Sequence, residues 1–243
     1  MDRRPMQGRI LVPLCLAVLA IVPAIAGNNV VMSPVLPEVN RHLAEGQADV
    51  VSNTMPLARA HAQLVLLGKD VHIGVLFQSV PTAEHQKCLD ALDSAMNEWD
   101  AVLGGSINLV RAKDGENTNI FVRFRPKVSM HGQDVAGYVN WKRSINTPTG
   151  GDPKGNFYAD LQIRSKDLEG NPMPEAAMRH AAMHELGHVL GLDDSEHQGD
   201  VMGPLDIENP VYAPSDLEVQ TVKSLRTQAQ DIIDASNATV VKK

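Results

Sequence analysis

The sequence predicts an α+β fold built on a partly parallel β-sheet. A strand pattern at residues 71–79 is followed by a long amphipathic helical pattern at 82–105 and by a second strand pattern at 106–111. This order favours parallel pairing of the two strands, with the helix packed on the sheet. The chain has 243 residues, 43% of them hydrophobic and 21% charged, so it can form one compact domain with additional segments.

The first elements are a weakly patterned segment, a strand and a helix. Residues 27–69 contain scattered Pro and Asn and one short helical stretch, PLARAHAQLVLLGKD, without a recognisable motif. The strand VHIGVLFQS follows, and the next helix ends at Gly104-Gly105. Apolar residues at helical spacing give that helix a face for the core: Leu89, Leu92, Met96 and Trp99.

Three further strands are predicted after this pair. Residues 119–125, NIFVRFR, alternate between apolar and basic side chains, which is typical of a strand with one buried face. VAGYVNW at 135–141 and FYADLQIRS at 157–165 supply the other two. The stretch between them, NTPTGGDPKGN, is rich in Gly, Pro and Asn and is predicted to be a loop.

Two helices are predicted in the last third of the chain. One is opened by Pro174 and runs to about Leu190. The other starts at the capping box SDLE, residues 215–218, and runs to about residue 233. A short C-terminal tail at 234–243 remains.

The N-terminal residues have the features of an export signal. Arg3, Arg4 and Arg9 form a basic start, and the apolar run at 10–26 ends in an Ala-Ile-Ala cleavage pattern. An uncleaved membrane anchor at 10–26 is the alternative, but 17 residues with two prolines make a marginal membrane span. We therefore expect residues 1–26 to be a signal peptide, and the mature protein to be secreted or extracytoplasmic without stable membrane insertion.

Cleavage changes both the charge and the cysteine content. The signal contains Asp2 and three arginines, so the mature chain carries a net charge near −9 instead of −7. An acidic exported chain is a poor nucleic-acid binder. Cys88 is then the one cysteine left, which excludes an internal disulfide. We expect it to pack in its helix, with a free reactive thiol as the alternative.

The stretch HELGHVLGLDDSEHQGDVMGP, residues 184–204, carries the chemistry of the chain. Residues four apart on a helix lie on one face, about 6 Å along the axis, so His184 and His188 can point at one metal ion. Glu185 lies next to that face, where it can take a proton from a water that the metal activates. Zinc fits this role because it lowers the pKa of water from 15.7 to about 7. HExxH alone is weak evidence, since many polar helices match it.

A third ligand requires the chain to reverse just after the helix. Gly191 lies where the helix would end, and glycine readily adopts the left-handed conformation of a sharp turn. Such a turn returns Asp194 towards the metal. His180 shares the helix face but lies about 12 Å along the axis from His188, so it is expected to support the site indirectly or to lie on the surface.

These residues resemble the signature of the metzincin peptidases, HExxHxxGxx followed by His or Asp. GHVLGLDDS is especially similar to the matrixins, and Met202 matches the methionine that forms a floor beneath the zinc in that family. The order of elements over residues 70–230 is also similar to a matrixin catalytic domain. The resemblance implies a metzincin-type zincin fold. Its mostly parallel, twisted five-stranded sheet has one antiparallel edge strand, a backing helix, an active-site helix and a C-terminal helix.

The resemblance also implies an organisation of the chain and of the site. Residues 27–69 would be an N-terminal extension or pro-segment, and residues 70–233 the catalytic domain. Residues 203–215 would form the wall of the pocket for the substrate side chain that follows the scissile bond. One catalytic zinc ion is implied, with these residues: the ligands His184, His188 and Asp194, the general base Glu185, and Gly191 and Met202 as structural support.

Asp194 departs from the matrixin pattern, which has histidine there, and is similar to the third ligand of the snapalysin group. A carboxylate binds zinc at about 2.0–2.2 Å, so ligation is chemically sound, although the added negative charge makes the zinc a weaker Lewis acid. The family geometry directs Asp193 away from the metal and places His197 three residues too late.

Other family features are weak or absent. No cysteine precedes the domain after cleavage, so a cysteine switch is not expected. HGQD at 131–134 only loosely resembles a structural-zinc loop and has no companion histidines before residue 180, so a second zinc is not expected. GGDPKGN has the composition of a Ca²⁺ loop, yet most such stretches are simply loops.

We interpret the sequence as an exported zinc-dependent endopeptidase that acts on protein or peptide substrates. The alternative is a catalytically silent metzincin-fold module that binds zinc or protein, against which the intact Glu185 argues. A third interpretation is an accidental motif in a structural protein. The combination of Gly191, Asp194 and Met202 makes this improbable.

Overall fold

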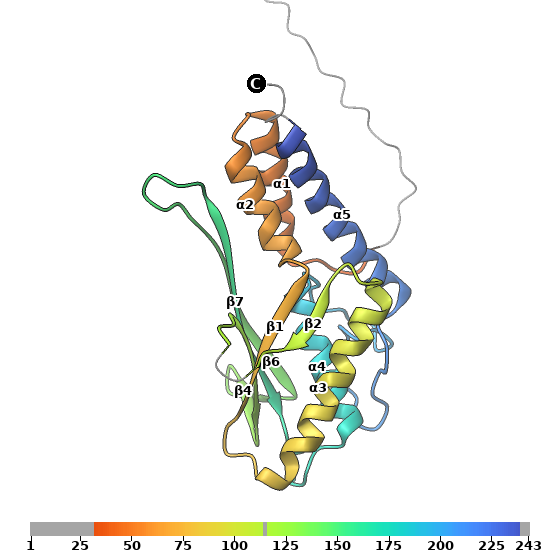
Figure 1. Ribbon diagram of the computed structural model, residues 1–243. Coiled ribbons are helices and arrows are strands. Elements are labelled where there is room, and N and C mark those ends of the chain that lie inside the picture. The colour runs from red at the N-terminus through yellow and green to blue at the C-terminus, as the bar shows by residue number, and fades with distance from the viewer. Residues whose placement is uncertain (1–31, 114–115, 239–243) are drawn as a thin grey trace, which may run out of the picture. The chain divides into compact units, whose positions relative to one another are not determined.

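The computed structural model of the protein describes residues 32–113 and 116–238 (Figure 1). The expected signal peptide, and the alternative anchor at 10–26, lie outside these residues. Within the two described stretches, no helix combines the length and the apolar character needed to cross a membrane.

Five strands form one mixed sheet in the order β2-β1-β3-β7-β6. The pairs β1–β2, β1–β3 and β3–β7 are parallel, whereas β6 runs antiparallel to β7 at the edge. This confirms the predicted α+β fold with a mostly parallel sheet and one antiparallel edge strand. The strands are β1 (Asp70–Phe77), β2 (Asn108–Arg111), β3 (Ile120–Arg125), β6 (Gly137–Asn146) and β7 (Lys154–Arg164).

The main core lies between this sheet and two helices, α3 (Thr82–Leu103) and α4 (Glu175–Val189). In β3 the apolar positions are buried and the alternating positions are partly exposed, as the sequence pattern predicts. Trp99 of α3 is fully buried and donates a hydrogen bond from Nε1 to the Met183 carbonyl of α4, at 3.0 Å. Cys88 is buried in α3 as expected, and burial raises the pKa of its thiol to about 11.

The predicted loop between β6 and β7 is shorter than the sequence suggested. The two strands stay paired from Gly137↔Ile163 to Asn146↔Lys154, so they form a long hairpin that projects from the sheet (Figure 1). Antiparallel ladder hydrogen bonds extend the hairpin through a polar stretch whose side chains predicted no strand. A separate ribbon consists of β4 (Val128–Met130) and β5 (Gln133–Val135), and the stretch HGQD forms its turn and the start of β5.

The largest difference from the prediction lies in residues 27–69. The predicted short helix is present as α2 (Met55–Leu66), but a second helix that was not predicted, α1 (Pro37–Val51), precedes it, and both pack with α5 (Asp216–Ala238) into a helical layer (Figure 1). The sequence of α1 did not predict a helix, because most of its side chains are polar and only a narrow stripe is apolar. α5 also runs to Ala238 and not to 233. The shared core consists of Leu36, Val39, Leu43, Ala58, Ala62, Val65, Leu225, Ala229 and Ile232.

Candidate metal centre

Helix α4 presents the two histidines of the HExxH motif side by side. The rings of His184 and His188 lie 4.9 Å apart between centroids and are nearly perpendicular. The Nδ1 atom of His184 lies 3.0 Å from the Val201 carbonyl oxygen, and that of His188 lies 2.9 Å from the Leu192 carbonyl oxygen. A carbonyl oxygen can only accept, so each Nδ1 carries the proton. Both Nε2 atoms therefore keep a lone pair for a metal.

The chain reverses immediately after α4 at Gly191, which has φ +106°. A side chain at this position would strain the backbone and would crowd Leu225 and Val39. The reversal brings Asp194 back over the histidines, with its Oδ1 atom 3.2 Å from His184 Nε2 and 3.4 Å from His188 Nε2. The turn expected from the sequence is therefore present.

The three side chains His184, His188 and Asp194 form a compact donor set. Their ligand atoms all lie within 4.8 Å of one another. Close contacts of its Oδ1 atom with His184 and His188 hold the pKa of the Asp194 carboxyl well below its usual range, so Asp194 is a carboxylate. Two imidazoles and one carboxylate are a donor set that zinc uses in catalytic sites, with a fourth position left open. These residues thus fit the zinc ion that the sequence motif implies.

The other acidic and histidine side chains of the loop do not join this set. Asp193 accepts a hydrogen bond from the backbone N–H of Asp194, at 3.0 Å. The His197 side chain is 77% exposed and lies 3.7 Å from Asp200. Asp193 and His197 therefore lie outside the candidate site, as expected from the metzincin signature.

Glu185 is buried beside the donor set and lies against the edge strand β6. A Cβ atom placed on Gly137 would collide with its carboxylate, so glycine at that position makes room for the Glu185 side chain. Burial raises the pKa of Glu185 to about 7, although the neighbouring His184 opposes the shift and Asp194 adds to it. The Glu185 carboxylate therefore lies in a buried position between His184 and the edge strand.

Met202 lies directly beneath the helix that carries the histidines. Its sulfur would meet a Cβ atom placed on Gly187, so the glycine of HELGH allows the methionine to pack against the helix backbone. Met202 is buried, and its carbonyl accepts a hydrogen bond from the Ser195 N–H at 2.8 Å. The contact ties the loop after Asp194 to the turn that contains Met202.

Glu218 is a residue of the site region that the sequence analysis missed. The capping box predicted its bond with Ser215, and the structure has both bonds of that box, at 2.7 and 3.4 Å. The same buried carboxylate also accepts the backbone N–H groups of Val201 and Met202, at 3.3 and 2.7 Å. The N-terminus of α5 thereby holds the methionine turn in place, which the four-residue pattern alone does not reveal.

His180 is buried and supports the site indirectly, which is one of the two alternatives left by the sequence. Its Nδ1 atom accepts the Val211 N–H at 3.2 Å, so its Nε2 atom carries the proton and faces the Val201 carbonyl at 3.2 Å. The same carbonyl oxygen lies 3.0 Å from His184 Nδ1. Two histidines of α4 are therefore anchored on one carbonyl of the methionine turn.

A second missed group connects α1 to the end of α4. The Trp141 ring stacks on the His188 ring with 5.7 Å between centroids. Trp141 Nε1 and Arg143 Nη1 both donate to Glu38 Oε1, and Arg143 Nη2 donates to the Val189 carbonyl at 2.9 Å. The Arg143 side chain is 1% exposed, so Glu38 is the partner that compensates its buried charge.

The segment before α1 also pairs with the loop that carries Asp194. Val35 and Leu192 form an antiparallel β-bridge. The N–H of Leu36 donates to the Gly191 carbonyl at 3.0 Å, and the N–H of Asp193 donates to the Pro34 carbonyl at 2.9 Å. These bonds surround the Gly191 reversal on both sides, so the N-terminal segment helps to fix the backbone next to Asp194.

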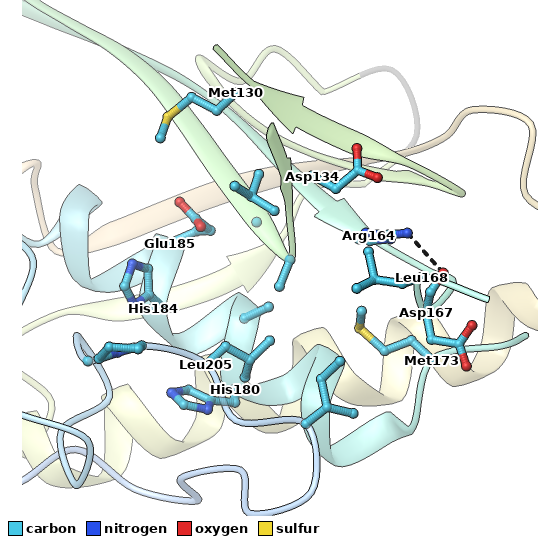
Figure 2. Close-up of a pocket in the computed structure, with 17 residues that line it drawn as sticks. Met130, Asp134, Arg164, Asp167, Leu168, Met173, His180, His184, Glu185 and Leu205 are labelled. Atoms are coloured by element: carbon cyan, nitrogen blue, oxygen red, sulfur yellow. Dashed lines mark hydrogen bonds between the residues drawn. The ribbon is translucent and has the colours of Figure 1, made fainter. Parts of the chain in front are cut away.

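A cavity of about 380 Å³ opens beside the donor set (Figure 2). His184 and Glu185 lie at one end of it, whereas Leu168 and Met173 lie at the other. Its wall includes Gly203, Pro204, Leu205 and Ile207, which belong to the stretch expected to form the substrate pocket.

A family model described as Peptidase_M10, Matrixin, matches residues 71–225. No curated protein matches. The solved structures that match include the crystal structure of metalloproteinase-II from Bacteroides fragilis, with 13% sequence identity and a TM-score of 0.38. The match covers 64% of this chain and 53% of that one, so the chain spans about half the length of its structural relative.

Proposed function

This chain belongs to the matrixin family, and on that premise we propose that it is an exported zinc-dependent endopeptidase. In this proposal His184, His188 and Asp194 hold one catalytic zinc ion, and Glu185 is the general base. The observation that carries the proposal is the position of Asp194 Oδ1, 3.2 and 3.4 Å from the two Nε2 atoms of the helix. Those distances are close to the separation of about 3.3 Å between ligands of one tetrahedral zinc ion with bonds near 2.0–2.1 Å.

The residues of the site have separate roles in peptide hydrolysis. When bound there, zinc would lower the pKa of a water molecule and polarise the scissile carbonyl. Glu185 lies in the same cavity as His184, where its carboxylate can take a proton from the attacking water and return it to the leaving nitrogen. The Nδ1 bonds of His184 and His188 to backbone carbonyls keep both rings oriented during this transfer.

The edge strand β6 offers a place for an extended substrate. β6 pairs with β7 on one side and is the last strand of the sheet among the described residues. An exposed strand edge can pair with a peptide through backbone hydrogen bonds. Gly137 of β6 lies against Glu185, so a peptide bound along this edge would pass the general base. The apolar wall at Leu205 and Ile207 then favours a substrate with an apolar side chain next to the scissile bond.

Cleavage of casein tests this function directly. We expect proteolysis by the purified protein, its loss after treatment with a chelator, and its return on addition of Zn²⁺. A chain that holds zinc in equilibrium dialysis but cleaves neither casein nor a peptide library would instead be the silent binding module considered above. A chain that holds no zinc would contradict both the endopeptidase and a zinc-binding module.

We also propose that residues 32–66 stay in the mature enzyme and that only residues 1–26 are removed. The support is the pairing of the segment around Val35 with Leu192 and the burial of Arg143 against Glu38. N-terminal sequencing of the exported protein should begin at Gly27. A start near Val71 in the active form would identify 27–69 as a pro-segment, and an intact Met1 chain in the membrane fraction would identify an anchor.

A further inference from the structure

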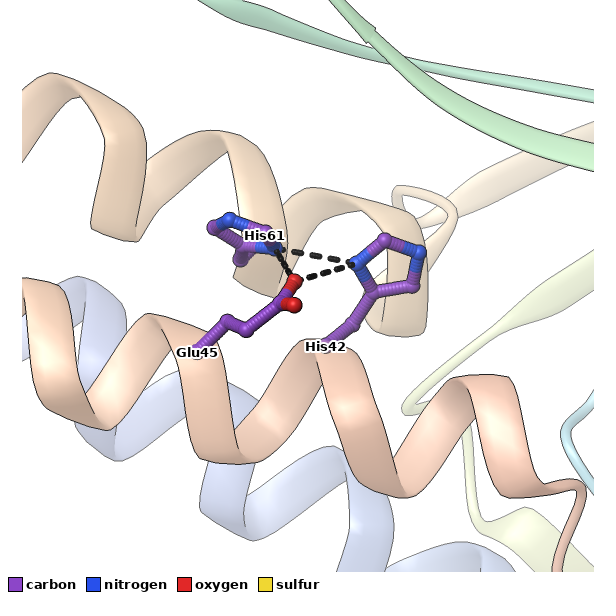
Figure 3. A group of neighbouring side chains, drawn as sticks. All are labelled: His42, Glu45 and His61. Carbon is purple, nitrogen blue, oxygen red and sulfur yellow. Dashed lines mark hydrogen bonds and ion pairs between the residues drawn. The ribbon is translucent and has the colours of Figure 1, made fainter.

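A second group of histidines lies in the helical layer, between α1 and α2. His42 and Glu45 lie one turn apart on α1, and His61 faces them from α2 (Figure 3). The Nδ1 atoms of His42 and His61 lie 2.9 Å apart. Glu45 Oε2 lies 3.4 Å from His61 Nδ1 and 3.9 Å from His42 Nδ1. We refer to His42, Glu45 and His61 as the α1–α2 cluster.

The dimensions of the α1–α2 cluster match those of a metal site. Its three ligand atoms all lie within 4.8 Å of one another, as they do in the catalytic site. A tetrahedral zinc ion with bonds near 2.0–2.1 Å separates its ligand atoms by about 3.3 Å. The three separations in the cluster, from 2.9 to 3.9 Å, lie on either side of that value. Small rotations of the side chains would therefore accommodate the ion.

Both histidines are in the state that a metal requires. His42 and His61 are buried, and burial lowers the pKa of His42 to about 4 and also lowers that of His61. Both rings are therefore neutral near pH 7, and a neutral imidazole has one nitrogen with a free lone pair. Glu45 is partly exposed, so it brings a carboxylate to the cluster from the solvent side.

Asp49 supplies the outer contact that ligating histidines commonly have. Its Oδ2 atom lies 3.6 Å from His61 Nε2, on the far side of the ring from the cluster. If His61 binds a metal through Nδ1, its Nε2 atom carries the proton and faces this carboxylate. A carboxylate behind an imidazole orients the ring as a ligand.

One cation competes for the cluster. The Nη1 atom of Arg41 lies 2.8 Å from Glu45 Oε2, and its Nη2 atom lies 3.3 Å from His42 Nε2. A guanidinium can only donate, so its bond to Nε2 requires the proton of His42 to be on Nδ1, where a metal would bind. The Arg41 side chain is 52% exposed and can turn into solvent. Binding of a metal would then move the proton of His42 to Nε2.

We propose that His42, Glu45 and His61 bind a second zinc ion, which joins α1 to α2. The sequence predicted one zinc only, and this site is additional to the catalytic one. The two imidazoles and the carboxylate select zinc over calcium or magnesium, which prefer oxygen ligands. A bound ion would fix the register of α1, the helix that also carries Glu38 one turn before His42. The site therefore stabilises the N-terminal helices and takes no part in hydrolysis.

Zinc content measures the site directly. The full exported chain, stripped with a chelator and dialysed against Zn²⁺, should hold two zinc ions by elemental analysis. Glu45→Ala should hold one, and because Glu45 is partly exposed this variant should fold even where His61→Ala does not. Arg41→Ala is the matched control on the same helix: it removes the competing cation, so it should hold two and bind the second more tightly.

The outcomes separate this site from the catalytic one. One zinc per chain in both the wild type and Glu45→Ala, or two in both, would overturn the proposal. A chain that cleaves casein but binds one zinc ion would support the proposed function and contradict the second zinc site. An inactive chain that binds two zinc ions would support the second zinc site and contradict the proposed function. The unfolding temperature provides a second measurement, since the second equivalent of Zn²⁺ should raise it in the wild type but not in Glu45→Ala.

Discussion

The two histidine clusters of this protein have the same donor chemistry but are assembled differently. In the candidate catalytic site, one helix and one turn provide His184, His188 and Asp194. In the α1–α2 cluster, His61 comes from a different helix and lies 19 residues from His42. The catalytic site also borders a cavity and has Glu185 beside its ligands. We propose that both clusters bind zinc and that the cavity and Glu185 are the features that make only one of them catalytic.

Replacement of Glu185 should have the largest effect, because it removes the feature that distinguishes the catalytic site. Glu185→Gln keeps the size of the side chain but cannot accept the proton. We expect peptide cleavage to fall by about 10²–10⁴-fold, the usual contribution of general acid–base catalysis. Bound zinc and the unfolding temperature should be unchanged.

The control for Glu185→Gln is Glu196→Gln, which removes an exposed carboxylate from the nearby loop. It should cleave at the wild-type rate. Cleavage by Glu185→Gln at a comparable rate would mean that another group is the base, and the difference between the two clusters would need a different explanation.

Asp194 tests whether the third ligand has been identified correctly. Asp194→Ala should weaken zinc binding at the catalytic site by more than about 100-fold, since loss of an outer-sphere partner alone commonly costs 10–100-fold. Asp193→Ala should bind zinc normally, because that side chain faces the Asp194 backbone. Asp194→His should keep the metal. Competition with a chromophoric chelator measures all three affinities, and an unchanged affinity in Asp194→Ala would exclude this residue as a ligand.

The same comparison explains what the sequence could and could not predict. His184, Glu185 and Asp194 were readable because a helix and a glycine turn fix their relative positions within eleven residues. The sheet was readable because β1 is mostly apolar and β3 alternates between buried and partly exposed side chains. Contacts that depend on the packing of distant elements have no such local signal, and Trp141 lies 103 residues from its partner Glu38.

Helix α1 was not predicted, for a related reason. α1 has few apolar residues, and Val39 and Leu43 become informative only when α2 and α5 are present to cover them. The methionine turn shows the same limit. The capping box predicted where α5 begins, but not that Glu218 also binds the N–H groups of Val201 and Met202.

Replacement of Glu38 tests how α1, which carries His42 and Glu45, is attached to the strand β6 next to His188. Glu38→Ala should lower the free energy of unfolding by about 3 kcal/mol, because it leaves the buried Arg143 guanidinium without its carboxylate partner. Glu38→Gln should have a smaller effect, since its carbonyl oxygen can still accept from Trp141 and Arg143. Urea unfolding measures both variants. Equal stability of Glu38→Ala and wild type would mean that α1 packs on the sheet independently of this ion pair.

The smallest expected effect concerns Asp49, which lies behind His61 in the α1–α2 cluster. Its Oδ1 atom accepts the Thr54 hydroxyl at 2.9 Å, while Oδ2 faces His61 Nε2 at 3.6 Å. Asp49→Asn can keep the first contact, so the end of α1 should stay folded, but it replaces a charged acceptor beside His61 with an amide. We expect zinc affinity at the cluster to fall by about 10-fold, at the lower end of outer-sphere effects.

The control is Asp90→Asn, which removes one negative charge from an exposed position on α3 and should leave the zinc affinity of the cluster unchanged. Titration of each variant with Zn²⁺ after the catalytic site is filled measures the difference. Equal affinities in the two variants would show that Asp49 does not orient His61. A tenfold loss confined to Asp49→Asn would show that the α1–α2 cluster has an outer acceptor behind one of its histidines, in the role that the Leu192 carbonyl has behind His188.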